Sequence, residues 1–154
     1  MRTIRTLLVL LLLSMACAVL AAPRDGLRIE QAWARATPAV ASVAAGYLVV
    51  INDGATPDRL LRIDSGIAQR IEMHRSVNEG GVMRMRPIEG GAVIPARGRL
   101  EFAPGGNHLM LIGPAHPLVA GETFEATLVF AHAGSRKVRF EVRGMDGGAP
   151  MHMH

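Results

Sequence analysis

Short apolar segments separated by Gly- and Pro-containing turns recur along the chain about every ten residues. Gly80-Gly81, Gly90-Gly91 and Pro104-Gly105-Gly106 are examples of these turn sequences. No long stretch shows the 3.6-residue period of a helix, so the pattern predicts an all-β Greek-key sandwich or small barrel. Residues 122–130 and 136–142 alternate between apolar and polar side chains and predict a closing hairpin.

The N-terminal residues predict export. Arg2 and Arg5 precede an unbroken apolar run at 7–13, and small residues follow near Ala21, as in a secretory signal peptide. We therefore expect an exported protein with no stable membrane insertion after cleavage. The expected parts are a signal peptide at 1–21, one domain at 22–143 and a flexible Met- and His-rich tail at 144–154.

Composition excludes several functions. Cys17 is the only cysteine, lies within the expected signal peptide and lacks the Leu usual three residues earlier in a lipoprotein cleavage box. The mature chain would then have no thiol for a disulfide, a nucleophile or a metal. Loss of Arg2 and Arg5 lowers the formal net charge from +4 to about +2, and six aromatic residues are too few for a nucleic-acid platform. No Ser-His-Asp order or paired carboxylates indicate an enzyme.

Histidine and methionine gather in three segments, "EMHRSVNEGGVMRMRP", "NHLML" and "PMHMH". A hairpin through residues 78–81 would bring His74 towards the strand that carries Met83 and Met85. In the second segment His108 and Met110 share one face of an expected strand, because side chains alternate. Loops and strand ends of a sandwich can meet at one end of the fold, so two imidazoles and two thioethers could converge there.

This donor set indicates a soft metal ion. Thioether sulfur is a poor ligand for Mg²⁺ or Ca²⁺, and zinc sites rarely use it, whereas Cu(I) accepts both thioether and imidazole. The alternative is ordinary packing in a non-metal interaction module, since Met fills irregular core gaps well. We assign Met73 and Met83 to such packing, and His116 and His132 to the surface because they adjoin turn residues.

The same residues resemble the signature of the periplasmic copper chaperones called PCuAC, formerly a domain of unknown function. That signature is a His, ten residues, a Met, about twenty-one residues and then His-x-Met. His74 and Met85 here have ten residues between them, and twenty-two precede His108-Leu109-Met110, one more than usual. The flanking text "AAGYLVVIND", "GGVMRMRP", "IPARG" and "PGGNHLMLIG" is also similar, and the resemblance runs from about residue 33 to 113.

The resemblance implies a cupredoxin-like β-sandwich or barrel that binds one Cu(I) and delivers it towards the dinuclear copper centre of cytochrome c oxidase. The implied ligands are His74, Met85, His108 and Met110. Implied partners are copper itself, a Sco-type protein and cytochrome c oxidase subunit II. Composition, as above, argues against nucleic acid as a partner. A periplasmic copper buffer or tolerance protein remains the nearest alternative. A blue-copper redox site is excluded because it needs a Cys thiolate.

The C-terminal tail could form a second copper site. Imidazole and backbone nitrogen suit Cu(II), and thioethers suit Cu(I). The candidate residues are Met151, His152, Met153 and His154. The alternative is a solvated tail with no role.

Overall fold

The computed structural model describes residues 26–147 as ten strands. The expected signal peptide at 1–21 and the candidate residues 151–154 lie outside the described residues. Within residues 26–147 there is no helix long and apolar enough to span a bilayer. The strands are β1 (Leu27–Arg35), β2 (Val43–Asn52), β3 (Asp58–Asp64), β4 (Ala68–Glu79), β5 (Val82–Pro87), β6 (Ala92–Ile94), β7 (Gly98–Phe102), β8 (His108–Pro114), β9 (Thr123–Phe130) and β10 (Gly134–Arg143).

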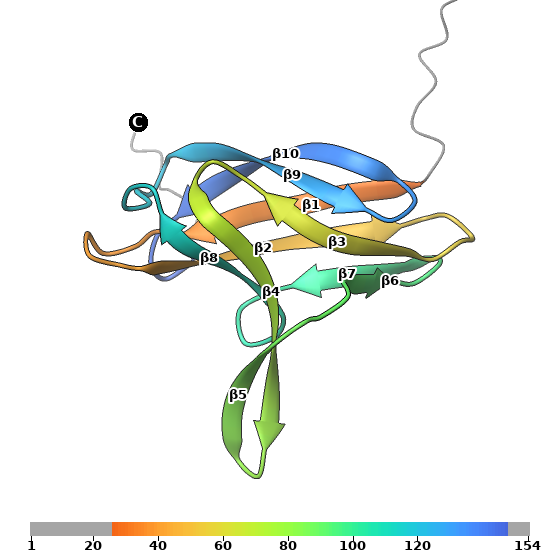
Figure 1. The fold of residues 1–154 in the computed structure, drawn as a ribbon, viewed down its shortest axis with the longest axis horizontal. Helices are drawn as coiled ribbons and strands as arrows, with labels where there is room; N and C mark the ends of the chain where they lie inside the picture. The colour runs from red at the N-terminus through yellow and green to blue at the C-terminus, as the bar shows by residue number, and fades with distance from the viewer. Residues whose placement is uncertain (1–25, 148–154) are drawn as a thin grey trace, which may run out of the picture.

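Seven of these strands close into a barrel (Figure 1). Their order is β4-β8-β2-β1-β10-β9-β3, and pairing of β3 with β4 completes the ring. β1 and β10 are parallel, and the other pairs of the ring are antiparallel. Neighbours that are not consecutive in the chain confirm the expected all-β, Greek-key, cupredoxin-like fold, and the expected β9–β10 hairpin forms.

Alternation of side chains accounts for the barrel core. In β10 the buried Phe140 and Val142 alternate with the exposed Arg139 and Glu141. Period-two alternation buries one face of each strand, and burial of a large apolar side chain contributes about 1.5–3 kcal/mol. The largest fully buried apolar side chains are Phe102, Phe140, Leu48, Leu60, Ile94, Leu109, Leu111, Leu118 and Leu128.

The second half of β4 leaves the barrel and pairs with β5 as a projecting hairpin, called the arm here and spanning residues 74–87 (Figure 1). Its two-residue turn has Gly80 and Gly81 at φ 63° and 86°. Positive φ at both central residues is the requirement of a type I′ turn, which glycine meets without strain. The Gly81 amide also donates to Asn78 Oδ1 at 2.8 Å. The hairpin predicted through residues 78–81 is confirmed.

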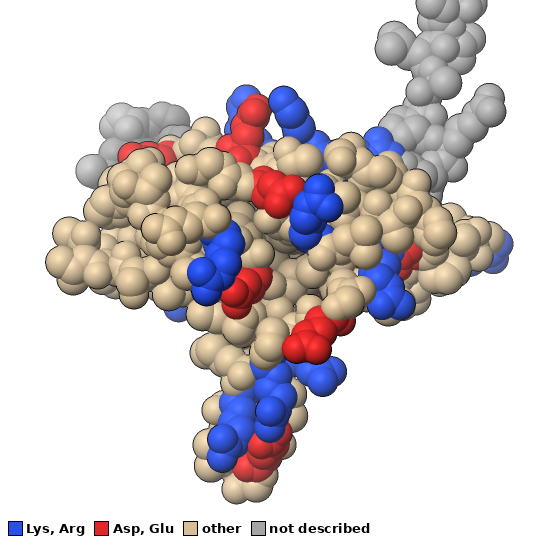
Figure 2. Space-filling view, viewed as in Figure 1, with Lys and Arg blue, Asp and Glu red and all other residues tan. Residues whose placement is uncertain are grey.

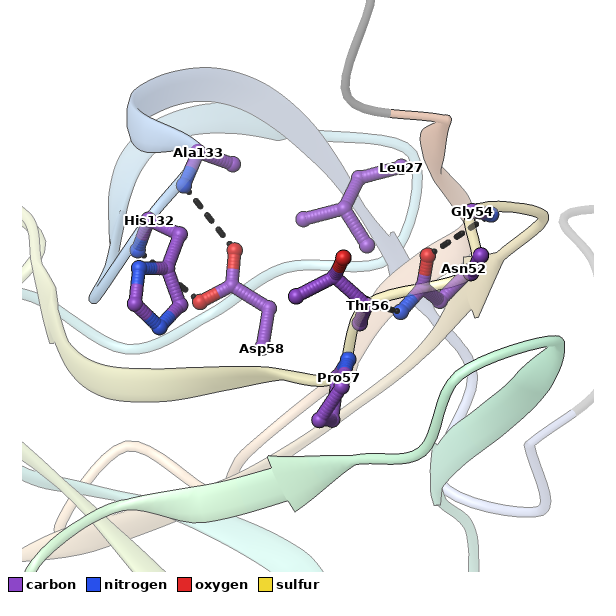
Figure 3. A pocket seen from close by; sticks show the side chains of 9 residues that line it. Leu27, Asn52, Gly54, Thr56, Pro57, Asp58, His132 and Ala133 are labelled. Atoms are coloured by element: carbon purple, nitrogen blue, oxygen red, sulfur yellow. Dashed lines mark hydrogen bonds between the residues drawn. The ribbon is translucent and has the colours of Figure 1, made fainter.

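Asp58 connects the start of β3 to the β9–β10 turn (Figure 3). Its buried carboxylate accepts hydrogen bonds from the backbone amides of Arg59, His132 and Ala133 at 2.7, 3.0 and 2.9 Å. Burial by itself raises the pKa of Asp58, but these three bonds outweigh it and hold the pKa below its ordinary value of 3.8. The carboxylate forms part of the wall of a pocket of about 260 Å³. Three of its roughly four acceptor positions are used by backbone amides of the fold.

Replacing Asp58 with Asn removes the charge that these amides stabilise, so Asp58→Asn should lower the free energy of unfolding at pH 7 by about 1–2 kcal/mol. Because the folded pKa is depressed, the wild-type contribution is complete above pH 3.8 and decreases as the pH falls below it. Urea unfolding at several pH values should therefore show the two proteins converging in acid. A constant difference from pH 7 to pH 3 would contradict this assignment.

Candidate metal centre

Antiparallel pairing of β4 with β8 sets His74 directly opposite His108. Their ring centroids lie 5.8 Å apart with the ring planes at 44°. With a metal–nitrogen bond of about 2.0 Å, two ring centres that share one ion can lie up to roughly 6.4 Å apart. The two imidazoles are therefore close enough to coordinate the same metal ion.

Met110 lies on the same face of the sheet as these imidazoles. It follows His108 by two residues in β8 and stands opposite Glu72, which precedes His74 by two residues in β4. Residues directly opposite, and residues two apart on one strand, point to the same side. Met110 is half-buried.

Met85 reaches this face from the arm. It stands opposite Ser76 in the β4–β5 pair, and Ser76 is two residues beyond His74 in β4. Met85 is therefore a diagonal neighbour of His74, at a Cα separation that long side chains span. Its side chain is 67% exposed. All four residues expected from the sequence thus lie on one face of the neighbouring strands β5, β4 and β8.

Each imidazole has one nitrogen engaged and one without a partner. His74 Nε2 lies 2.9 Å from Glu72 Oε2, and His108 Nδ1 lies 3.2 Å from the Gly106 carbonyl oxygen. Carboxylate and carbonyl oxygens accept, so these nitrogens donate. His74 Nδ1 and His108 Nε2 are buried without a hydrogen-bond partner among the described residues.

The arrangement is the one that metal-ligating histidines adopt. A carboxylate or carbonyl commonly binds the N–H of such a ring and leaves the other nitrogen free for the metal. An unpaired buried polar atom otherwise costs about 1–3 kcal/mol, and here two such nitrogens lie on facing rings. The lone pairs of His74 Nδ1 and His108 Nε2 are therefore the nitrogen donors that this site offers.

Glu72 is kept ionised by its neighbours. Arg70 Nε donates to Glu72 Oε1 at 2.7 Å. This hydrogen bond, followed by the one from His74, holds the pKa of Glu72 below its ordinary value of 4.5. A charged acceptor favours the His74 tautomer that carries its proton on Nε2.

Exposure increases from the imidazoles to the arm. His108 is 9% exposed and the side chain of His74 12% exposed, whereas Met85 is open to solvent. Among residues 26–147 no group of three or more His, Cys, Asp or Glu could hold a metal ion. A donor set of two nitrogens and thioether sulfur would favour a soft monovalent ion over a hard divalent one.

Among the other sequence-based assignments, some are confirmed and one is wrong. Met73 is buried in the core as expected, and His116 and His132 are exposed as expected. The assignment of Met83 to core packing was wrong, because β5 lies on the arm beyond the barrel and Met83 is 57% exposed. Residues 151–154 lie outside the described part of the chain.

Sequence reasoning did not assign roles to Glu72 and Gly106, which bind the two imidazoles. The signal for Glu72 was its place two residues before His74, on the same strand face. The signal for Gly106 was the Gly-rich turn just before His108, whose backbone carbonyl is close to that ring.

The closed cupredoxin-like barrel, with paired imidazoles and thioethers on one face of three strands, defines a PCuAC-type domain. This chain belongs to the family described as "Putative lipoprotein LpqE-like", whose model matches residues 27–142. The chain is also 32% identical over 123 residues to "Putative lipoprotein Lxx21020" of Leifsonia xyli subsp. xyli, which covers 80% of this chain and 73% of that protein.

Two solved structures are similar to the barrel. The copper-bound PCuAC domain from PmoF2 matches with a TM-score of 0.65 and 28% identity over 81% of this chain and 94% of that one. The solution structure of CuI-DR1885 from Deinococcus radiodurans matches with a TM-score of 0.59 and 26% identity over 85% of each chain. In both cases the shared fold extends over most of this chain.

We predict that Glu72→Ala will weaken the preference of His74 for the Nε2–H tautomer, because the anionic acceptor is lost. Long-range ¹H–¹⁵N correlation spectra of the metal-free protein measure the tautomers of both histidines. His108 is the internal control, since the Gly106 carbonyl that holds it is unchanged. A His74 tautomer ratio identical to that of the wild type would show that Glu72 does not orient the ring.

Proposed function

We propose that this protein is a periplasmic copper chaperone that binds one Cu(I) and passes it to an acceptor protein. It acts as a carrier and not as an enzyme. The proposed ligands are His74, Met85, His108 and Met110.

The observation that supports this most is the pair of buried, unpartnered nitrogens on facing rings, His74 Nδ1 and His108 Nε2. Two neutral imidazoles and two neutral thioethers keep the single positive charge of Cu(I) and disfavour Cu(II). The similarity to a copper-bound PCuAC domain and to CuI-DR1885 supports the same ion.

The surroundings of the donors suit transfer. Copper passes between proteins by ligand exchange, so a carrier needs a metal that an incoming ligand can reach. Met85 is 67% exposed and lies on the arm, which projects from the barrel (Figure 1). The absence of a thiolate from the mature chain, once the expected leader is removed, would make the site less sensitive to oxidation in the periplasm.

The proposed destination is the dinuclear copper centre in subunit II of cytochrome c oxidase, with a Sco-type protein as a partner in the transfer. This part of the proposal rests on the resemblance of the sequence to copper chaperones. The leader expected at 1–21 supports export, and the resemblance to periplasmic copper chaperones supports a periplasmic location. A periplasmic copper buffer is the nearest alternative, and a non-metal interaction module is a more distant one.

The C-terminal residues Met151, His152, Met153 and His154 are proposed as a second copper site. Their imidazoles and adjacent backbone nitrogens suit Cu(II). This proposal is supported by residue chemistry alone.

Met110→Leu keeps the side-chain volume and removes the sulfur, so we predict weaker Cu(I) binding, by about tenfold to a hundredfold, with little change in thermal stability. Anaerobic titration against a competing Cu(I) chelator measures the affinity. Copper-edge X-ray absorption of the loaded protein counts sulfur and nitrogen neighbours and should lose one sulfur. Met145→Leu is the matched control, because Met145 is an exposed methionine outside the site.

Two results would count against this proposal. Unchanged affinity of Met110→Leu would remove Met110 from the ligand set. Cu(I) binding by the wild type no tighter than micromolar would defeat the chaperone function and favour the interaction module.

An experiment in cells distinguishes copper delivery from copper storage. In a strain lacking this protein and grown at low copper, we predict low cytochrome c oxidase activity. The wild-type gene should restore the activity and His108→Ala should not, because His108 Nε2 is a proposed copper donor. Oxidase activity that is normal in the deletion strain, with reduced tolerance of high copper, would favour the buffer.

A further inference from the structure

Met83 lies on the ligand face of the arm, beyond Met85. It stands opposite Asn78 in the β4–β5 pair, two residues from Met85 along β5. Residues two apart on a strand point to the same side, so both thioethers lie on the face that continues to the imidazoles. The two side chains are 57% and 67% exposed.

The opposite face of the arm is occupied by charged side chains. Arg84 and Arg86 alternate with the two methionines along β5, and both form ion pairs with Glu79, at 3.1 and 2.6 Å. Figure 2 shows basic and acidic side chains gathered on the projecting arm. The arm therefore has one charged face and one face with sulfur donors.

The spacing allows the two sulfurs to hold a single ion. Residues two apart on a strand have Cα atoms about 6.6 Å apart. Methionine has three rotatable side-chain bonds, so two such thioethers can converge on one soft ion between them. Every residue of β5 is exposed, so no packing restrains these side chains.

The resident nitrogens cannot meet an acceptor directly. His108 is buried and His74 nearly so, and both are held by hydrogen bonds to Gly106 and Glu72. Exchange of a ligand requires that the incoming donor touch the metal. An ion that leaves these rings must therefore first reach a position where solvent or a partner has access.

We propose that Met83 and Met85 form an outer Cu(I) position on the arm, through which the ion passes between the buried imidazoles and an external acceptor. This inference rests on the proposed function and adds a step to it. In that step a bond from copper to the Met83 sulfur forms while a bond from copper to an imidazole nitrogen breaks. Copper stays Cu(I), no electron is transferred and the thioether exchanges no proton.

The test uses the full-length protein loaded anaerobically with one equivalent of Cu(I) and mixed rapidly with excess bathocuproine disulfonate. We expect Met83→Leu to release copper about tenfold more slowly, which corresponds to about 1.4 kcal/mol in the barrier. Its equilibrium Cu(I) affinity and its sulfur count by X-ray absorption should match the wild type. Met145→Leu, which removes an exposed methionine outside the arm, should release copper at the wild-type rate.

Three outcomes would overturn the inference. Release from Met83→Leu at the wild-type rate means that the ion does not pass over Met83. A loss of affinity and of one sulfur neighbour means that Met83 is a resident ligand. Equal slowing by Met145→Leu means that the effect is not specific to the arm. If the wild type binds no Cu(I), the proposed function itself fails, which this experiment distinguishes from the three results above.

Discussion

The ladder between β4 and β8 is the interaction on which the candidate centre depends. It runs from Ala68 opposite Pro114 to His74 opposite His108. Beyond His74 the strand β4 leaves the barrel and takes β5 as its partner. The two imidazoles therefore stand where the rigid barrel ends and the arm begins. A site at this boundary combines donors fixed by the sheet with donors on an exposed hairpin.

The core determines the register of that ladder. Met73 opposite Leu109 is a buried pair that alternates with the imidazole pair along the same strands. Slippage by one residue would turn the buried side chains to the ligand face and the imidazoles into the core. The cost would include burial of unpaired nitrogens as well as exposure of Leu109. Packing of the barrel thus positions His74 and His108 without any metal, and a preorganised pair of nitrogens is what the proposed Cu(I) site requires.

The sequence predicted which side chains share a face of a strand and where turns occur. It did not predict which strands are neighbours in the sheet. Alternation predicted that His108 and Met110 share a face, and the Gly-rich turn predicted the hairpin that presents Met85. Neither pattern says that β8 lies beside β4, because that pairing joins segments distant in the chain and is decided by burial of the whole core. Met83 shows the same limit. Its local pattern fits a core strand, but its exposure follows from β4 extending past the barrel, which no local pattern encodes.

The contrast between the two kinds of donor bears on the proposed role as a carrier. Hydrogen bonds to Glu72 and Gly106 orient the imidazoles, so these rings lose little freedom when they bind an ion. The exposed thioether of Met85 has no such restraint and retains its rotamers. In the proposed site the oriented nitrogens would hold the resting ion, and transfer would open a bond to an imidazole as the ion shifts to the exposed thioethers of the arm. A storage site gains nothing from such an opening, since closure on all sides would retain the ion longer. The exposed arm therefore supports the proposed role in transfer.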